Sequence, residues 1–167
     1  MTVAAHVQTL DMKVAMYTLT HVDRSASPEF QKSVARLKAD GNYKCWISGS
    51  TEDLQVHHFG CEWSEQGECD LTELGKVMLA LDVYGYNKLP EFAGKPIESV
   101  DDVRVMMVLS QKYHTGADHA TGTGTGIHNM PFGWWLEQRI AKKGEDPIPQ
   151  DGESITDTEG RVDKNVG

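Results

Sequence analysis

The sequence lacks the long apolar run, the disulfide framework and the basic leader that would mark a membrane or secreted protein. No stretch approaches the ~20 consecutive apolar residues of a membrane helix, although 39% of the 167 residues are hydrophobic. His6, Gln8 and Asp11 interrupt the N-terminal segment, so we expect no signal peptide. Three cysteines, an odd number in a long chain, do not form a disulfide framework. We therefore expect one cytoplasmic domain with reduced thiols and no membrane partner.

Basic residues are also scarce. Lys and Arg number 16 against 25 Asp and Glu, which gives a formal charge of −9. Residues 145–167 carry seven of the acids, two of the bases and few large apolar side chains, so we expect this tail to be disordered. The body over 1–144 is acidic as well and has no general attraction for nucleic acid. A polyanion would have to be held by a local basic patch, by a bound metal ion or with the help of a partner.

Hydrophobic spacing and capping residues predict several helices. The clearest begins at the N-cap Ser27 with Pro28 in its first turn, and it ends before Gly41. A second is expected over 70–81, where Asp70 and Glu73 resemble a capping box. A last helix begins near Pro131, and the N-terminal region has a helical stripe that is also compatible with a strand: Val3, Val7, Leu10, Val14 and Tyr17.

Extended segments are expected at three places along the middle of the chain. Runs at 43–47 and 54–59 are separated by polar turn residues, and a compact apolar run follows at 104–109. A short helix is expected to start at 111. The glycine-rich stretch at 121–126 is a loop, because no strand-to-helix turn surrounds it and its spacing does not fit a dinucleotide fingerprint.

Histidines are the residues with the clearest chemical potential. Five of the seven lie between 57 and 128, and two of them, His57 and His58, are adjacent at the end of an expected strand. Neighbouring strand residues point to opposite faces, so one imidazole can bind a metal while the other remains a base. Taken singly, each histidine is more simply explained as a hydrogen-bonded surface or core residue.

Three sequence pieces form a recognisable pattern together. They are CWISG…LQVHH over 45–58, the MVLSQKYH run ending at His114, and GIHNMPFGWW over 126–135. The pattern resembles the phage-type HNH (His-Me finger, ββα-metal) endonucleases over about 45–140. The resemblance implies an α+β fold, with a small ββα-metal hairpin-helix core, surrounding helices, an N-terminal helical region and an insert near 60–101, all within one domain at 1–144.

The resemblance also implies roles for individual residues. His58 would be the general base that activates water, while His57 and His114 would bind one divalent ion, whether Mg, Mn, Ni or Zn. His128 and Asp118 are candidates to complete the metal shell, and Asp118 lies four residues after His114. The function implied is a metal-dependent DNA endonuclease that hydrolyses phosphodiester bonds, with DNA as its partner.

Two departures from the family pattern keep a second function open. Val105 stands where the family has an asparagine, and Cys45 and Ser110 stand where many relatives have structural-zinc cysteines. The alternative is a catalytically weakened phage protein on the HNH scaffold that binds and inhibits a host protein. A host or phage protein partner and a homodimer are both compatible with the sequence, and a phage-encoded chain would act in the host cytoplasm.

Overall fold

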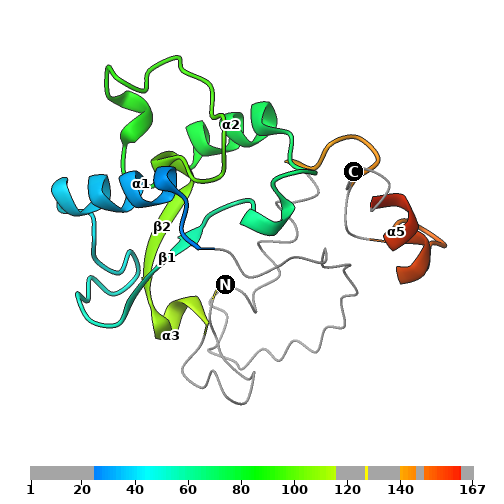
Figure 1. Cartoon of the computed structure of the whole chain (residues 1–167), viewed down its shortest axis with the longest axis horizontal. Coiled ribbons are helices and arrows are strands. Elements are labelled where there is room, and N and C mark those ends of the chain that lie inside the picture. Colours follow the sequence, from blue (N-terminus) through cyan, green and yellow to red (C-terminus); the bar gives the residue numbers. More distant parts are fainter. Residues whose placement is uncertain (1–24, 116–126, 128–139, 146–148, 163–167) are drawn as a thin grey trace, which may run out of the picture.

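The computed structural model describes residues 25–115, 127, 140–145 and 149–162. It shows a mixture of helix and strand, in agreement with the α+β expectation (Figure 1). The main elements in chain order are α1 (Pro28–Ala39), β1 (Leu54–His58), α2 (Leu71–Ala80), β2 (Met106–Ser110), α3 (Gln111–His114) and α5 (Ile155–Val162). Short 3-10 turns occur at Trp63–Glu65, Tyr86–Lys88 and Val103–Val105.

Strands β1 and β2 form an antiparallel pair whose register assigns each residue to a face. Leu54 is opposite Ser110, and the pairing continues to His57 opposite Met107 and His58 opposite Met106. Directly paired residues share a face and successive residues alternate. His57 therefore lies on the face of Met107 and His58 on the face of Met106.

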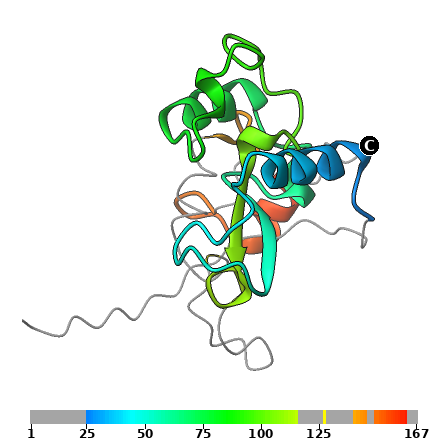
Figure 2. The ribbon, with the colours of Figure 1, turned by 90° about the vertical axis from the view of Figure 1, so that its left-hand side faces the viewer.

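Both faces of β2 are covered, which explains why its apolar residues do not alternate with polar ones. Met107 and Leu109 belong to a core with Leu74 and Met78 of α2, while Met106 and Val108 pack with Leu37 of α1. A strand buried on both faces is expected to be continuously apolar. Figures 1 and 2 show α1 and α2 near one end of the strand pair and α3 at the other.

The two long helices begin where the capping residues predict. Ser27 Oγ accepts a hydrogen bond from the Phe30 amide at 2.9 Å, and Pro28 is the first residue of α1. Asp70 accepts hydrogen bonds from the amides of Thr72 and Glu73 at the start of α2. Each cap satisfies amides that have no partner inside the helix. These two predictions are confirmed.

The outer edge of β2 is closed by groups that are not strands. The Val108 amide donates to the Tyr84 hydroxyl at 2.9 Å, and the Val108 carbonyl accepts from the Trp46 amide at 2.8 Å. Both backbone groups of this residue are therefore paired on the side away from β1.

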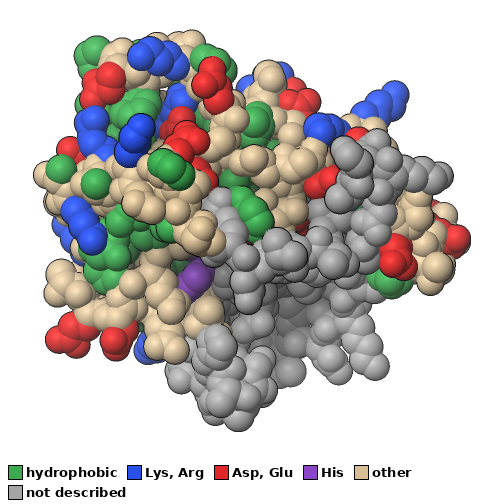
Figure 3. Space-filling model, viewed as in Figure 1, with side chains coloured by type: hydrophobic (Ala, Val, Ile, Leu, Met, Phe, Trp, Pro, Cys, Tyr) green, Lys and Arg blue, Asp and Glu red, His purple; other side chains and the backbone are tan. Residues whose placement is uncertain are grey.

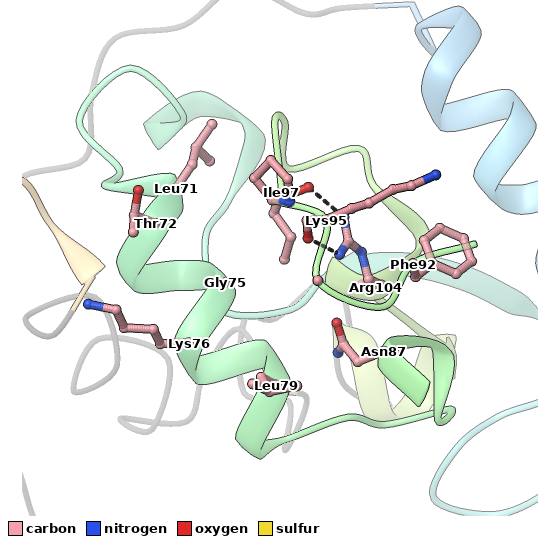
Figure 4. Close-up of a pocket in the computed structure, with 12 residues that line it drawn as sticks. Leu71, Thr72, Gly75, Lys76, Leu79, Asn87, Phe92, Lys95, Ile97 and Arg104 are labelled. Atoms are coloured by element: carbon pink, nitrogen blue, oxygen red, sulfur yellow. Dashed lines mark hydrogen bonds between the residues drawn. The ribbon is translucent and has the colours of Figure 1, made fainter. Parts of the chain in front are cut away.

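The long connection between β1 and β2 is held in place by Arg104. Its guanidinium contacts Asp102 at 2.6 Å and donates to the carbonyl oxygens of Lys95 and Pro96, each at 2.8 Å. Figure 4 shows the two bonds to carbonyl oxygens beside α2, at one wall of a groove of about 320 Å³. The groove is lined by neutral and basic residues and by none of the candidate site residues.

The run at 43–47 does not form the expected strand. It makes a reverse turn in which the Cys45 amide donates to Ser50 O at 2.8 Å and the Gly49 amide to Cys45 O at 2.7 Å. Gly49 has a φ of 74°, a left-handed conformation that glycine adopts without steric cost. The apolar Trp46 and Ile47 are each 54% exposed on this turn, so they do not mark a buried strand.

The expectation of a disordered tail over 145–167 is wrong for its central part. Residues Ile155–Val162 form α5, in which Thr158 is 0% and Val162 1% exposed. Arg161 pairs with Glu153 at 2.8 Å and donates to Gly144 O at 3.1 Å. A few buried groups and this ion pair provide order that the low apolar content does not suggest.

Val162→Ala should therefore lower the stability of the protein by about 1.5 kcal/mol, since two buried methyl-sized groups are lost at ~0.8 kcal/mol each. Glu159→Ala, an exposed change in the same helix, is the matched control and should have little effect. Thermal denaturation of both variants checks the prediction. Equal melting temperatures would show that α5 contributes nothing to the fold.

Several predicted elements lie outside the described residues. These are the N-terminal stripe, the glycine-rich loop at 121–126 and most of the helix expected from Pro131. Of the last helix, Ile140 is described and is buried at 1% exposure in the core with α2. No helix in the described part of the chain is both long and apolar enough to cross a membrane.

Candidate functional site

The structure brings His57 and His114 together. Their ring centroids are 5.1 Å apart with an interplanar angle of 61°. Helix α3 follows β2 directly, and its Gln111 amide donates to Asp53 O at 2.9 Å, just before β1. This contact fastens the start of α3 to the hairpin and places His114 beside the strand that carries His57.

The ring of His114 is oriented by Gln55. Its Nδ1 lies 2.6 Å from Gln55 Oε1, and Gln55 shares a face of β1 with His57. An amide oxygen only accepts, so His114 Nδ1 carries the proton and Nε2 carries the lone pair. Metal-binding histidines commonly donate their second ring nitrogen to an oxygen in this way. This arrangement fits a metal ligand.

Glu62 is a site residue that sequence reasoning missed. Its Oε1 lies 3.5 Å from His57 Nδ1, and it reaches this place after Gly60, which has a φ of 98°. Burial, and secondarily the neighbouring Glu65 carboxylate, raise the pKa of Glu62 to about 7. A carboxyl group with such a pKa exchanges protons near neutrality. Only its position four residues after His58 could have suggested it.

His58 lies on the opposite face of β1, towards α1. Its Nε2 is 2.8 Å from Asp101 Oδ1, and its ring centroid is 5.6 Å from that of Phe30. The side chains of His58 and Asp101 are 12% and 7% exposed. The structure therefore does not group His58 with His57 and His114. No sequence signal links His58 to a carboxylate so far along the chain.

Of the predicted metal ligands, the structure describes His57 and His114. Among the described residues, no group of three or more His, Cys, Asp or Glu is arranged to hold a metal ion. His128 and Asp118, the other predicted ligands, lie outside the described residues. The described residues thus bring two of the predicted ligands together, with Glu62 beside one of them.

Charge around the described surface is mixed. Figure 3 shows Lys and Arg side chains interspersed with Asp and Glu over α1 and the connection after α2. Several of the bases are paired with acids, including Arg36 with Asp40 and Glu91. Such pairing leaves little positive field at a distance. The described residues on this face therefore form no broad basic surface for a polyanion.

Cys45 is held by serines rather than by further cysteines. The Ser48 amide lies 3.5 Å from Cys45 Sγ. Burial raises the pKa of the Cys45 thiol, but hydrogen bonds from Ser48 and Ser110 outweigh burial and lower this pKa to about 6. Cys61 and Cys69 are also free and buried. Serine donors thus stabilise a thiolate at the position where the resemblance implies a lost zinc site.

The lowered pKa of Cys45 predicts a pH-dependent contribution to stability. A thiol whose pKa is lower in the folded than in the unfolded state stabilises the fold above the unfolded pKa, and this stabilisation is lost as pH falls through the folded pKa. With values of 9.0 and about 6, wild type should exceed Cys45→Ala in stability most at high pH. Urea denaturation of both proteins at about pH 9 and about pH 6 measures the difference. A difference that stays constant between these pH values would contradict the thiolate.

Val105, where the family has an asparagine, is part of the core. It is 0% exposed, and its carbonyl accepts from the Phe59 amide at 2.6 Å. An amide side chain here would be buried among apolar groups and would need new partners. The backbone of Val105 still connects the segment after β1 with the segment before β2.

Comparison with protein-family models, with curated proteins and with solved structures finds no match to this chain. Its function is therefore inferred from its own residues and their geometry.

Proposed function

We propose that the protein is a metal-dependent endonuclease of the phage-type HNH class that hydrolyses phosphodiester bonds in DNA. The observation that carries the proposal is the contact between His57 of β1 and His114 of α3, with ring centroids 5.1 Å apart. An antiparallel hairpin followed directly by a helix, with one histidine on each, is the arrangement that the sequence resemblance implies. His128 and Asp118 remain candidate ligands under this proposal.

The chemistry of the side chains supports this reading. A divalent ion held by His57 and His114 would neutralise charge that develops on a scissile phosphate. His114 is pre-oriented by Gln55 so that Nε2 carries the lone pair. His58 follows His57 directly, with a Cα–Cα spacing of about 3.8 Å, and an imidazole is the side chain most often used as a general base. His57 and His58 thus lie at the same end of the hairpin, with their side chains on opposite faces of β1.

A nicking assay on supercoiled plasmid tests the proposal. Wild type, assayed with Mg, Mn, Ni and Zn in turn, should convert the plasmid to the open circle with at least one of them. His58→Ala should keep its metal and lose at least ~10²-fold in rate, the low end for general acid–base catalysis. Lys112→Ala, an exposed change on α3, controls for altered DNA contacts. No cleavage with any metal would reject the nuclease function.

A binding protein on the same scaffold is the second candidate. The observation that favours it is the exposed pair Trp46 and Ile47, each 54% accessible on one reverse turn. The net charge of −9 also opposes DNA binding. Exposed apolar side chains presented on a fixed turn suit contact with another protein. Loss of partner binding in Trp46→Ala, with cleavage absent in wild type, would favour this function.

A further inference from the structure

We infer that Asp101 is the positioning residue of His58, which sets the tautomer and the orientation of its imidazole. The inference rests on the proposed function, since it concerns the residue assigned there as the general base. It is carried by the contact between His58 Nε2 and Asp101 Oδ1 at 2.8 Å, in which both side chains are largely buried.

The contact fixes which ring nitrogen of His58 carries the proton. A carboxylate only accepts hydrogen bonds, so Nε2 donates its proton to Asp101. The lone pair is then on Nδ1, and this is the atom that would take a proton from water. Phe30 packs against the ring at 5.6 Å between centroids, which limits its rotation. Tautomer and orientation of the imidazole are thus both set by neighbours on the α1 side.

Asp101 is itself held in a fixed position. Ser27 Oγ donates to its second carboxylate oxygen at 2.6 Å, and Ser33 Oγ donates to its carbonyl at 2.6 Å. The Asp101 amide donates to Ser99 Oγ at 3.0 Å. Because Ser27 is the N-cap of α1 and Ser33 lies within this helix, α1 holds both the carboxylate and the backbone of Asp101. A partner that is already fixed loses little entropy when it orients a reacting group.

The register of the hairpin explains why this segment supplies the partner. Met106 is paired with His58, so the chain just before β2 runs past the end of β1. Asp101 and Val105 both lie in that stretch, but Val105 is turned into the core at 0% exposure. Asp101 reaches His58 from the same stretch.

In the reaction, Asp101 would act only through His58. Water gives a proton to His58 Nδ1, its oxygen bonds to phosphorus, the bond from phosphorus to the leaving sugar oxygen breaks, and that oxygen takes a proton from solvent. The imidazolium that forms keeps its Nε2 proton on Asp101. A carboxylate in this place stabilises the developing positive charge more than a neutral group does.

Two substitutions of Asp101 and one matched control test the inference. Asp101→Ala removes the acceptor, and Asp101→Asn keeps its shape but removes its charge, which maintains the test if the alanine variant does not fold. Lys32→Ala is the control, because it changes an exposed side chain of α1 and leaves both His58 and Asp101 in place. Nitrogen NMR of the His58 ring reports the tautomer, and plasmid nicking reports kcat and KM separately.

Wild type and Lys32→Ala should show His58 protonated on Nε2, and Asp101→Ala should lose this preference. In both Asp101 variants kcat should fall by about 10–100-fold, the range for partners that orient a catalytic side chain, with KM and metal affinity unchanged. A wild-type ring protonated on Nδ1, or a folded Asp101 variant with the wild-type kcat, would overturn the inference and leave the nuclease function standing. If the wild type cleaves no plasmid with any metal, the proposed function fails, and the positioning role of Asp101 fails with it.

Discussion

Alanine at both His57 and His114 should abolish binding of a divalent ion while the protein remains folded. The two rings are 5.1 Å apart, and no group of three or more His, Cys, Asp or Glu among the described residues is arranged to hold a metal ion without them. Metal affinity depends steeply on ligand number, so losing two imidazoles removes most of the binding free energy. Titration calorimetry with Ni or Mn, beside far-UV circular dichroism, measures both properties.

The matched control for this double variant is His58→Ala. It removes an imidazole from the same strand end, but on the face turned towards Asp101. We expect it to bind metal as wild type does. Gln55→Ala provides a graded result, since His114 loses its orienting acceptor and the affinity should fall about 10–100-fold. If the double variant binds metal as tightly as wild type, the metal site is elsewhere in the chain.

The second large effect is expected from Arg104→Ala, which should destabilise the protein by about 3–5 kcal/mol. Arg104 is 7% exposed, and its side chain satisfies Asp102 and two carbonyl oxygens at once. Removing it leaves a carboxylate and two carbonyl groups short of donors in a largely buried place. The connection between β1 and β2 would lose the hydrogen bonds by which Arg104 holds it together.

Chemical denaturation of Arg104→Ala and of Arg36→Ala measures this effect against a control. Arg36 also pairs with carboxylates, those of Asp40 and Glu91, but on the exposed side of α1. Exposed pairs contribute little because water and salt screen them. Arg36→Ala should therefore denature almost as wild type does. If both variants lose the same free energy of unfolding, burial does not decide how much each ion pair contributes to stability.

Local sequence signals were sufficient for the elements whose boundaries are set by local contacts. Ser27 and Asp70 start α1 and α2 because their side chains satisfy the first amides of each helix. The apolar run before His114 was correctly assigned to a strand, although the strand begins at Met106. The run at 43–47 was misread, because exposed Trp46 and Ile47 have the composition of a strand but lie on a turn.

Contacts that depend on how the loops fold in three dimensions could not be predicted from the sequence. The pairing of His58 with Asp101 and that of His57 with Glu62 depend on how the connection after β1 folds back. Helix α5 was missed for a related reason, since its order rests on Thr158, Val162 and one ion pair rather than on a broad apolar face. The nearness of His57 and His114 was expected from the family resemblance, and their role as metal ligands stays a prediction.

The paired outer edge of β2 has a consequence for how the folded chain can associate with other molecules. An unpaired strand edge can recruit a strand from another molecule, and an apolar run such as Met106–Ser110 is the kind of segment that does so. Here the Tyr84 hydroxyl and the Trp46 amide already occupy both backbone groups of Val108. The hairpin therefore cannot be extended into a larger sheet at this residue without first displacing a side chain and a turn. At Val108, the outer edge of β2 is protected in this way from pairing with a strand of another molecule.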